Sequence, residues 1–308
     1  MALWARMTFR IGTRGSPLAL VQAGLVRDAL CALHDWAPEH VAIVPIRTTG
    51  DRVQDRALAE IGGKALWTKE LDRALLACDI DCAVHSMKDV ETVRPDAIRI
   101  AAMLPRADVR DRLVGAGSIA ALRAGAVLGT SSPRRAAQIR RLRPDVTTIV
   151  FRGNVATRLA KLAAGEADAT LLAAAGLERL GRDDVGVAID TAVLLPAPAQ
   201  GAVGIEVRTD DDTAAALVEA IGDGVTQACV GAERALLARL VADCHSPVAA
   251  LATIEGGVMH IIAELLCEDG SAHVTGEIHG EPGVALAEAL ARDLLARAPD
   301  AVRRLFDG

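Results

Sequence analysis

A strand that ends in glycine and threonine, followed closely by Ser-Pro and a helix, occurs twice in this chain. The first copy runs from Gly12-Thr13 to Ser16-Pro17, and the second from Gly129-Thr130 to Ser132-Pro133. A serine N-cap followed by proline at the first helical position is a strong signal for a helix start. The backbone N–H groups exposed at such a start favour a bound anion. The repeat therefore predicts two related α/β domains, each with an anion-binding corner.

The length of 308 residues is long for one hydrophobic core and suits two or three domains. Pro196-Ala197-Pro198 predicts a stiff connection, and residues 201–207 alternate like a strand that returns to the first domain's sheet. Two crossings between two lobes predict a hinge of the kind found in proteins that close around a ligand. Strands at 258–266 and 272–278 and a helix at 284–298 predict a carboxy-terminal domain. We expect a first domain at residues 1–104 plus 200–219, a second at 105–199 and a third at 220–308.

The composition argues against several classes of protein. With 51% hydrophobic and 24% charged residues, the chain is globular rather than disordered. A net charge of −6 and the lack of tyrosine count against a nucleic-acid binder. No apolar run approaches the roughly 20 residues that a membrane-spanning helix needs, and the amino terminus lacks a signal-peptide pattern. We expect a cytoplasmic protein with no membrane or nucleic-acid partner.

Asp89 follows a short segment, residues 80–84, that alternates like a half-buried strand. In an open α/β sheet, ligands bind beyond the carboxyl ends of the strands. Lys88 and Asp89 would therefore stand at the mouth of a crevice, close enough to tune each other's protonation. Taken alone, the segment is more typical of a solvated loop, and only the rest of the chain favours the crevice.

Arginines accompany both predicted helix starts. Arg14 lies beside the first, and Arg134 and Arg135 occupy the first turn of the second, where a cation opposes the helix dipole. A residue placed against its local preference indicates function. We expect a solvated helix face to explain the other arginines nearby, namely Arg140, Arg141 and Arg143.

The segment Arg152-Gly153-Asn154 repeats the pattern of a strand end, a glycine and a helix, and that helix carries Arg158. Because planar guanidinium groups bind carboxylates in bidentate fashion, these arginines predict a ligand with several carboxylates or phosphates.

Cys244 lies in the segment Asp243-Cys244-His245-Ser246-Pro247, between a predicted helix and a proline-marked turn. Exposure in such a loop suits a nucleophilic or covalently modified thiol, and His245 could lower the pKa of that thiol. An isolated Cys-His pair is more often coincidence. A zinc site is less expected still, since no second Cys/His pair stands at ligand spacing, and we expect no metal.

Gly62-Gly63-Lys64 lies between two helical patterns, and Trp67 follows it. One interpretation is a turn between helices with a packed indole ring. The other is a lid that carries Lys64 over a ligand.

Together these segments resemble the porphobilinogen deaminase family, also called the hydroxymethylbilane synthases. They keep the family's order and spread over most of the chain. The matching segments are Arg10-Ile11-Gly12-Thr13-Arg14-Gly15-Ser16-Pro17-Leu18-Ala19-Leu20, Gly62-Gly63-Lys64, Ala83-Val84-His85-Ser86-Met87-Lys88-Asp89, Gly129-Thr130-Ser131-Ser132-Pro133-Arg134-Arg135, Arg152-Gly153-Asn154, Ala175-Gly176-Leu177 and Gln200-Gly201-Ala202.

The resemblance implies an α/β fold of three domains. The first two would be doubly wound lobes like those of periplasmic binding proteins, with a hinge, and the third a small α+β domain. It implies a dipyrromethane cofactor held through a thioether to Cys244. Such an enzyme, a transferase of tetrapyrrole and haem biosynthesis, joins four porphobilinogen molecules head to tail with loss of ammonia. It then releases hydroxymethylbilane by hydrolysis, and the family leads us to expect a monomer.

The resemblance also implies roles for individual residues. Asp89 matches the catalytic aspartate, which would stabilise the cation formed when ammonia leaves and would move protons. The arginines that match the family's anion-binding positions are Arg14, Arg134, Arg135, Arg152, Arg158 and Arg179. Further expected contacts to cofactor or substrate are Ser16, Lys64, Trp67, Ser86, Lys88, Thr130, Ser131, Ser132, Gly153, Asn154 and Gln200.

Single positions and the cysteine loop depart from the family pattern. Trp67 replaces a phenylalanine, Glu60 a residue that is often basic, and Glu91 a proline. The cysteine loop usually has glycines around it, whereas here Ala242 and Asp243 precede Cys244, His245 follows it and Ala249 replaces a glycine. The Asp243 carboxylate would raise the pKa of the Cys244 thiol and slow cofactor attachment.

Two rival functions use the same arginines. A two-lobed anion-binding protein without chemistry would need neither Asp89 nor Cys244. A nucleic-acid binder would bind with an affinity that falls steeply as salt is added. The acidic net charge counts against this second function.

Overall fold

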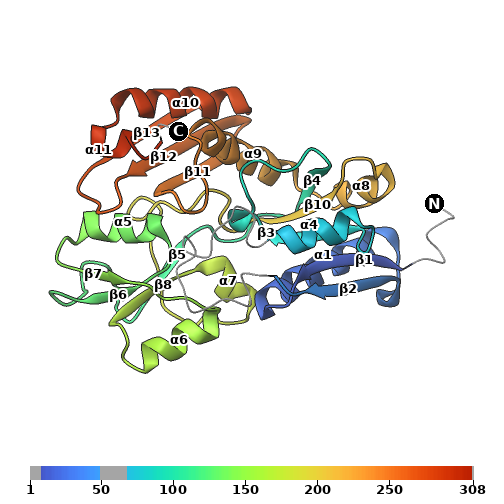
Figure 1. Ribbon diagram of the computed structural model, residues 1–308, viewed down its shortest axis with the longest axis horizontal. Coiled ribbons are helices and arrows are strands. Elements are labelled where there is room, and N and C mark those ends of the chain that lie inside the picture. The colour runs from blue at the N-terminus through green and yellow to red at the C-terminus, as the bar shows by residue number, and fades with distance from the viewer. Residues whose placement is uncertain (1–7, 49–67, 307–308) are drawn as a thin grey trace. The chain divides into compact units, whose positions relative to one another are not determined.

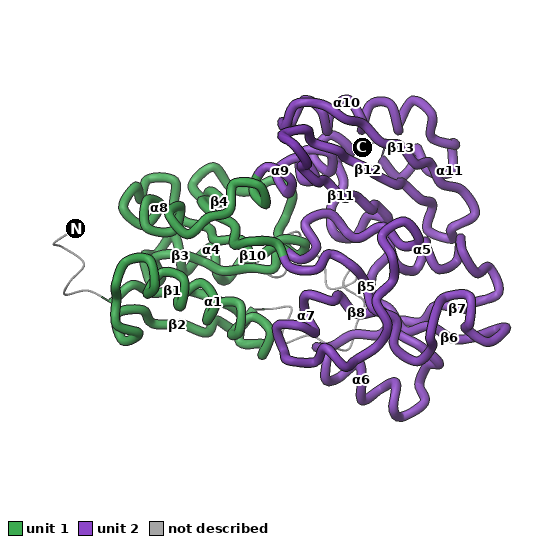
Figure 2. Tube along the Cα trace, turned by 180° about the vertical axis from the view of Figure 1, so that it is seen from behind, with its two compact units in different colours: residues 1–106, 202–227 green, residues 107–201, 228–308 purple. Residues whose placement is uncertain are grey.

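The structure is a computed structural model that describes residues 8–48 and 68–306. The chain divides into two units, residues 1–106 with 202–227 and residues 107–201 with 228–308 (Figure 2). Lys64, Trp67 and Glu60 lie outside the described residues. In the described part of the chain, no helix is long and apolar enough to cross a membrane.

The first unit is built on a five-stranded sheet with the order β2-β1-β3-β10-β4 (Figure 1). β1 runs parallel to β2 and β3, whereas β10 is antiparallel to β3 and β4. The strands are β1 (Phe9–Arg14), β2 (Val41–Ile46), β3 (Cys82–Ser86), β4 (Ile98–Met103) and β10 (Val203–Arg208).

Helices cover both faces of this first sheet. On one face α1 (Pro17–His34) and α8 (Asp212–Glu219) pack their apolar residues against Ile11, Val84 and Ile205. On the other face α4 (Lys69–Leu76) packs against Ile80 and its neighbours. Two short 3-10 helices, η2 (Pro38–His40) and η3 (Met87–Asp89), follow α1 and β3.

The second unit contains a sheet with the same pattern, in the order β7-β6-β8-β5-β9. Again the first three strands are parallel, and the fourth, β5, is antiparallel to both its neighbours. The strands are β5 (Asp111–Val114), β6 (Val127–Gly129), β7 (Thr147–Ile149), β8 (Ala169–Ala173) and β9 (Val187–Ala188). In both sheets, the antiparallel fourth strand is therefore the one that follows a crossing of the chain into that unit.

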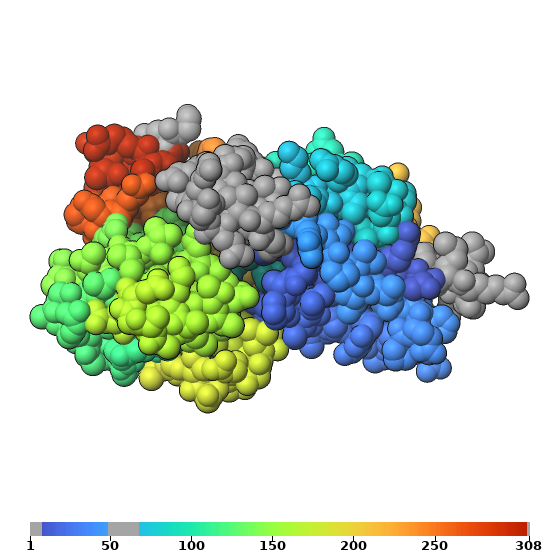
Figure 3. Space-filling model, turned by 60° about the horizontal axis from the view of Figure 1, so that its bottom comes forward, coloured from blue at the N-terminus to red at the C-terminus, as the bar shows by residue number. Residues whose placement is uncertain are grey.

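The helices of this second sheet also lie on both faces. α5 (Pro133–Leu142) packs Ile139 against Leu128 and Leu171 on one face. α6 (Val155–Ala163) and α7 (Ala174–Arg179) pack on the other face. α6 has no fully buried residue and forms part of the yellow-green surface in Figure 3.

The third sheet is antiparallel, with the order β11-β12-β13. Its strands are β11 (Val248–Glu255), β12 (Val258–Leu266) and β13 (His273–Gly280), and its helices are α9 (Gly224–Arg239), α10 (Val284–Arg297) and α11 (Asp300–Arg303). One face of the sheet packs on these helices around Leu236, Ile261 and Leu290. The predicted strands and helix of the carboxy-terminal domain are confirmed, as is the mixed α/β class with three sheets.

The repeated glycines of the two corners share a packing role. A Cβ atom at Gly12 would lie 2.2 Å from Ile80, and one at Gly129 would lie 2.4 Å from Phe151. Gly129 is the last residue of β6, whereas β1 continues two residues past Gly12 to Arg14, and at both glycines a neighbouring apolar side chain crosses the backbone. A side chain at either position would push the strand away from that neighbour.

Candidate functional site

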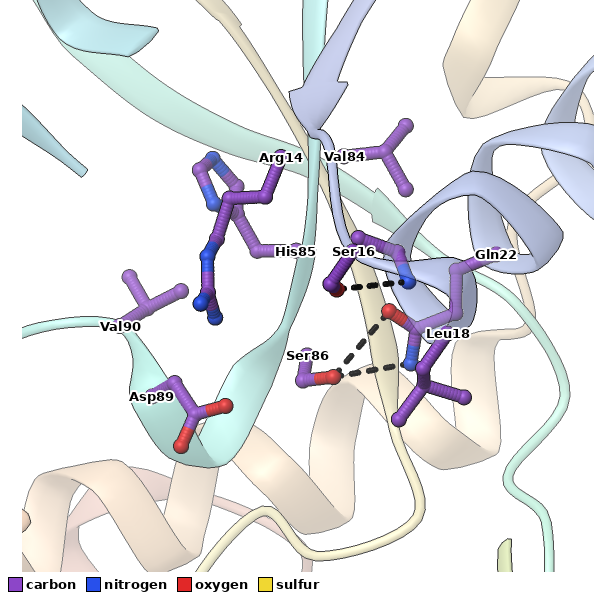
Figure 4. Close-up of a pocket in the computed structure, with 10 residues that line it drawn as sticks. Arg14, Ser16, Leu18, Gln22, Val84, His85, Ser86, Asp89 and Val90 are labelled. Carbon is purple, nitrogen blue, oxygen red and sulfur yellow. Dashed lines mark hydrogen bonds between the residues drawn. The ribbon is translucent and has the colours of Figure 1, made fainter. Parts of the chain in front are cut away.

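A pocket lies at the carboxyl ends of β1 and β3 in the first unit (Figure 4). Its polar lining residues are Arg14, Ser16, Gln22, His85, Ser86 and Asp89. Ser16 is the N-cap of α1, and its hydroxyl accepts a hydrogen bond from the Ala19 N–H at 3.3 Å. The sequence predicted this cap, and it brings the amino end of a helix to the pocket wall.

Asp89 and Arg14 point into the same space from opposite sides of this pocket (Figure 4). Asp89 is half-buried at the end of η3, directly after β3. The buried Met87 anchors η3, because its N–H donates to the Ala202 carbonyl at 3.1 Å and its side chain fills the space beside Gly204. The local sequence thus turns the chain sharply and leaves the Asp89 carboxylate at the pocket.

Gln22 is a pocket residue that the sequence analysis did not identify. It is buried on α1, where its amide donates to Ser86 Oγ at 2.8 Å and accepts from the same hydroxyl at 3.1 Å. This pair fixes the Ser86 side chain beside Asp89. A buried glutamine within the apolar face of a helix was the available signal.

A buried charged network lies behind the pocket. Glu206 on β10 is fully buried, 3.1 Å from His85 Nε2 and 2.7 Å from Arg94 Nε. Burial alone would raise the pKa of Glu206, but His85 and Arg94 lower it to about 2. The network holds His85, a lining residue of the pocket, against the sheet.

The same network accounts for one departure from the family pattern. Glu91 accepts hydrogen bonds from Arg94 at 2.6 Å and from the Thr68 hydroxyl at 2.8 Å. Arg94 also pairs with Asp72. Glu91 therefore replaces a rigid proline with a polar link that ties the loop after Asp89 to the start of α4.

The second unit has a matching polar corner at the carboxyl end of β6. Ser132 caps α5, and the Thr130 hydroxyl accepts from the Ser132 N–H at 3.2 Å. Arg158 donates to Ser131 Oγ at 3.1 Å and to the Gly153 carbonyl at 3.0 Å. The structure thus brings together the predicted residues of the two segments at 130–132 and 152–158.

Gly153 and Asn154 form the turn that makes this approach possible. Gly153 has a φ of +112°, and a Cβ there would lie 2.6 Å from Thr157. Asn154 caps α6 by accepting from the Thr157 N–H at 2.9 Å. Arg152 is half-buried directly before them.

Arg134 and Arg135 are buried, with 3% and 5% of their surface exposed. Both pair with Asp111 at the start of β5, at 2.8 and 2.6 Å. Burial alone would raise the pKa of Asp111, but the two guanidinium groups hold it well below its usual range. Asp111 is a second residue that the sequence analysis missed, because its partners lie more than twenty positions away.

Gln200 and Arg179 extend this region of the second unit. Gln200 Nε2 donates to Asp111 Oδ1 and to the Val109 carbonyl, both at 2.8 Å. Arg179 donates to the Gly201 carbonyl at 2.6 Å, and its burial lowers its pKa.

The expectation of a solvated face for the remaining arginines of α5 is wrong. Arg140, Arg141 and Arg143 are half-buried. Arg141 pairs with Glu264 of β12 at 3.0 Å, and Arg140 donates to the Glu268 carbonyl at 2.8 Å. Arg143 donates to carbonyls of the 119–123 loop. These arginines join α5 to the third sheet and to a loop, so their role is structural.

Cys244 is exposed in the turn between α9 and β11. Asp243 shapes that turn, since its carboxylate accepts from the His245 N–H at 2.8 Å and its own N–H donates to Ser246 Oγ at 3.1 Å. An exposed thiol on a hydrogen-bonded turn can form a thioether without disturbing a packed core. The residue present therefore fits a covalently attached group.

Two α/β sheets of one topology, each followed by a helix that a serine caps, define a protein built from two related α/β lobes. Comparison with known proteins gives the particular family. The model described as porphobilinogen deaminase, dipyromethane cofactor binding domain, matches residues 9–216, and that of the porphobilinogen deaminase C-terminal domain matches residues 227–297. The chain belongs to the porphobilinogen deaminase family.

Curated relatives carry the same name. The chain is 60% identical to the porphobilinogen deaminase of Sphingopyxis alaskensis over 304 residues, which is 96% of each protein. It is 50% identical to that of Nitrobacter hamburgensis over 303 residues, or 97% of this chain and 96% of the relative.

Solved structures give a more distant likeness. A periplasmic binding protein of Salmonella typhimurium with high arginine specificity has a TM-score of 0.38 and 13% identity, covering 71% of this chain and 93% of its own. The L-cystine solute receptor of Neisseria gonorrhoeae has a TM-score of 0.38 and 18% identity, covering 70% and 85%. The strand orders described above define the fold without these likenesses.

Proposed function

We propose that this chain joins four porphobilinogen molecules head to tail, releases ammonia at each addition and then hydrolyses off hydroxymethylbilane. The family match over almost the whole length supports the activity, which is that of a transferase in tetrapyrrole biosynthesis. The observation that carries the assignment within the fold is the Asp89 carboxylate, held in a pocket with Arg14 at the carboxyl ends of two strands.

Asp89 has two roles in the reaction: it stabilises positive charge on the substrate, and it transfers protons. When ammonia leaves the substrate, positive charge develops on the pyrrole ring, and a fixed carboxylate stabilises that charge. The same carboxylate accepts and returns a proton at its Oδ atoms as general base and acid. Met87, packed below it, keeps the carboxylate in place between additions.

Arg14 and the amino end of α1 bind a carboxylate of the substrate in the first unit. Porphobilinogen carries an acetate and a propionate, and a guanidinium beside a capped helix start favours such a group. Ser86, fixed by Gln22, and Lys88 complete the contacts on this side. Their position next to Asp89 aligns the ring with the carboxylate.

The corner of the second unit binds further carboxylates. Thr130, Ser131 and Ser132 supply hydroxyl and N–H donors at the start of α5, with Arg158 alongside. Further contacts come from Arg152, Gly153, Asn154, Arg179 and Gln200. Arg134 and Arg135 act with this corner through Asp111, which orders the first turn of α5. Lys64 and Trp67 remain predicted contacts.

Cys244 holds the dipyrromethane cofactor through a thioether. When bound, this cofactor supplies the pyrrole ring to which the first substrate is joined. The exposed turn around Cys244 gives the thiol the access that attachment requires. Because the thioether persists through turnover, Cys244 is an anchor and not the nucleophile of each addition.

We further propose that the enzyme works as a monomer in the cytoplasm, without a membrane or nucleic-acid partner. The net charge of −6 supports the absence of a nucleic-acid partner. Analytical ultracentrifugation of the purified protein tests whether it is a monomer. A dimer at the concentration used for activity assays would contradict this proposal.

The direct test of the function is to incubate the purified protein with porphobilinogen. We expect the substrate to be consumed with stoichiometric release of ammonia, and a linear tetrapyrrole that cyclises and absorbs as a porphyrin after oxidation. Tight binding of porphobilinogen without consumption would favour the rival anion-binding protein.

A further inference from the structure

Two histidines and a glutamate gather on the third sheet, outside the residues assigned above. His260 lies on β12, and Glu277 and His279 lie on β13. One possible ligand atom from each residue lies within 4.8 Å of the other two. His260 Nε2 is 3.1 Å from Glu277 Oε2, and the two imidazole rings stack with centroids 4.2 Å apart.

The register of the sheet fixes this cluster. His260 and His279 are direct cross-strand partners, so their side chains share one face. Glu277 stands two residues before His279 and therefore points to that same face. The opposite face, which carries Ile261 and Ile278, packs on the helices of this domain.

Solvent reaches all three side chains. His260 is half-buried, and Glu277 and His279 are exposed. Further along the same face of β12, Glu264 is buried by its contacts with Gln138 and Arg141 of α5. The face is thus covered at the Glu264 end, while the His260 end is open to an ion from solution.

The ligand set selects a class of ion. Imidazole nitrogens with one carboxylate oxygen suit Zn²⁺, Ni²⁺ and Cu²⁺, whereas Ca²⁺ and Mg²⁺ prefer oxygen ligands alone. Two ligands at about 2.0–2.1 Å from a tetrahedral zinc ion lie roughly 3.3 Å apart. The 3.1 Å between His260 Nε2 and Glu277 Oε2 is close to that edge, and rotation of the exposed His279 ring brings in the third ligand.

We propose that His260, Glu277 and His279 bind one divalent transition-metal ion of the zinc class on the open face of the third sheet. Three protein ligands leave a fourth position for water. The ion links β12 to the edge strand β13 and stabilises the domain that carries Cys244, a role separate from the chemistry at Asp89.

Titration of the cofactor-bound protein with ZnCl₂ by calorimetry tests this site. We expect one zinc ion per chain, and binding at least about tenfold weaker in His260→Ala and in His279→Ala, since even the loss of a supporting contact costs that much. Glu277→Gln should weaken binding as well. The matched control is His273→Ala, a histidine at the other end of β13, which should bind zinc as the parent does.

Thermal unfolding provides a second readout. An ion that binds only the folded protein stabilises it by RT ln(1 + c/Kd), where c is the free ion concentration, so the melting temperature rises as the zinc concentration exceeds the Kd. We expect zinc to raise it in the parent and in His273→Ala, but not in His260→Ala or His279→Ala. Two results would overturn the proposal. One is that the parent binds no zinc, and the other is that His260→Ala and His279→Ala bind zinc and are stabilised by it as strongly as the parent.

Discussion

The two lobes share a strand order, but the acidic residues near the carboxyl ends of their parallel strands differ in burial and in charge pairing. In the first unit, Asp89 stands half-buried at the end of η3, directly after β3, in a pocket with Arg14. In the second unit, Asp111 pairs with Ala173 at the end of β8 and is fully buried between Arg134 and Arg135. Asp89 is therefore accessible to a ligand, whereas the charge of Asp111 is neutralised by two guanidinium groups.

The first unit also has a buried acid, but it lies deeper. Glu206 is opposite Ala83 rather than at the end of β3, and it is neutralised by His85 and Arg94. In both sheets the fourth strand carries a buried acid, which lies at the strand's start in the second unit (Asp111) and deeper in the first (Glu206). In the first unit, the edge instead carries Asp89, which is half-buried and lines the pocket.

The largest expected effect comes from Asp89→Asn, which removes the carboxylate proposed as general acid and base. We expect turnover of porphobilinogen to fall by about 10²–10⁴-fold, the contribution of a positioned general acid and base. The free energy of unfolding should change by no more than about 0.5 kcal/mol, since no buried charge is left unpaired. Steady-state rates and urea unfolding measure the two quantities.

Asp79→Asn is the matched control for that variant. Asp79 is exposed and precedes β3 at its other end, so its loss should leave the rate unchanged. Near-normal turnover in Asp89→Asn would remove the catalytic role from the first lobe.

The second lobe should show the reverse behaviour in Asp111→Asn. Removing one partner of a buried ion pair leaves the guanidinium groups uncompensated, and such a loss costs about 3–5 kcal/mol of unfolding free energy. Urea unfolding measures it. Asp145→Asn, which breaks the exposed pair with Arg143, should have a much smaller effect, and equal effects would show that the Asp111 cluster is not a structural centre.

Glu206→Gln tests the deeper acid through its pH dependence. The pKa of Glu206 is lowered to about 2 in the folded state from 4.5, so its stabilisation is fully present above pH 4.5 and is lost as the pH falls toward 2. We expect the variant to be less stable by on the order of 3 kcal/mol at neutral pH.

The stability difference between Glu206→Gln and the parent should then narrow as the pH is lowered below 4.5. Unfolding curves at several pH values measure this trend. Glu219→Gln, which breaks the surface pair with Arg99, serves as the control and should show no such convergence. A constant difference across the pH range would contradict the buried-network account.

The smallest effect is expected from Glu91→Gln. It weakens the link to Arg94 but leaves that guanidinium paired with Asp72 and Glu206. A partly exposed pair of this kind contributes about 0.2–1 kcal/mol. Asp96→Asn, at an exposed position, is the control and should leave the free energy of unfolding unchanged. If Glu91→Gln lowered the free energy of unfolding by several times the expected amount, the loop after Asp89 would depend on this one link.

Local signals predicted much of the fold. The Ser-Pro pairs at residues 16–17 and 132–133 begin helices as expected, because capping depends only on neighbouring residues. The position of Asp89 after a strand end was predictable for the same reason.

The residues that were missed have distant partners. Asp111, Glu206 and Gln22 acquire their roles from contacts that sequence spacing does not show. The same limit applies to the His260 cluster, whose ligands meet across two strands and not at a local spacing. Arg141 was misinterpreted because it pairs with Glu264 of the third sheet, and Arg143 because it bonds to carbonyls of the 119–123 loop.

The most direct test of the account is the intact mass of the purified protein, followed by mapping of the peptide that contains Cys244. We predict the added mass of two linked pyrrole units on that peptide in the parent and in Asp89→Asn, and none in Cys244→Ser. A bare Cys244 thiol in protein that still forms the tetrapyrrole would contradict the account.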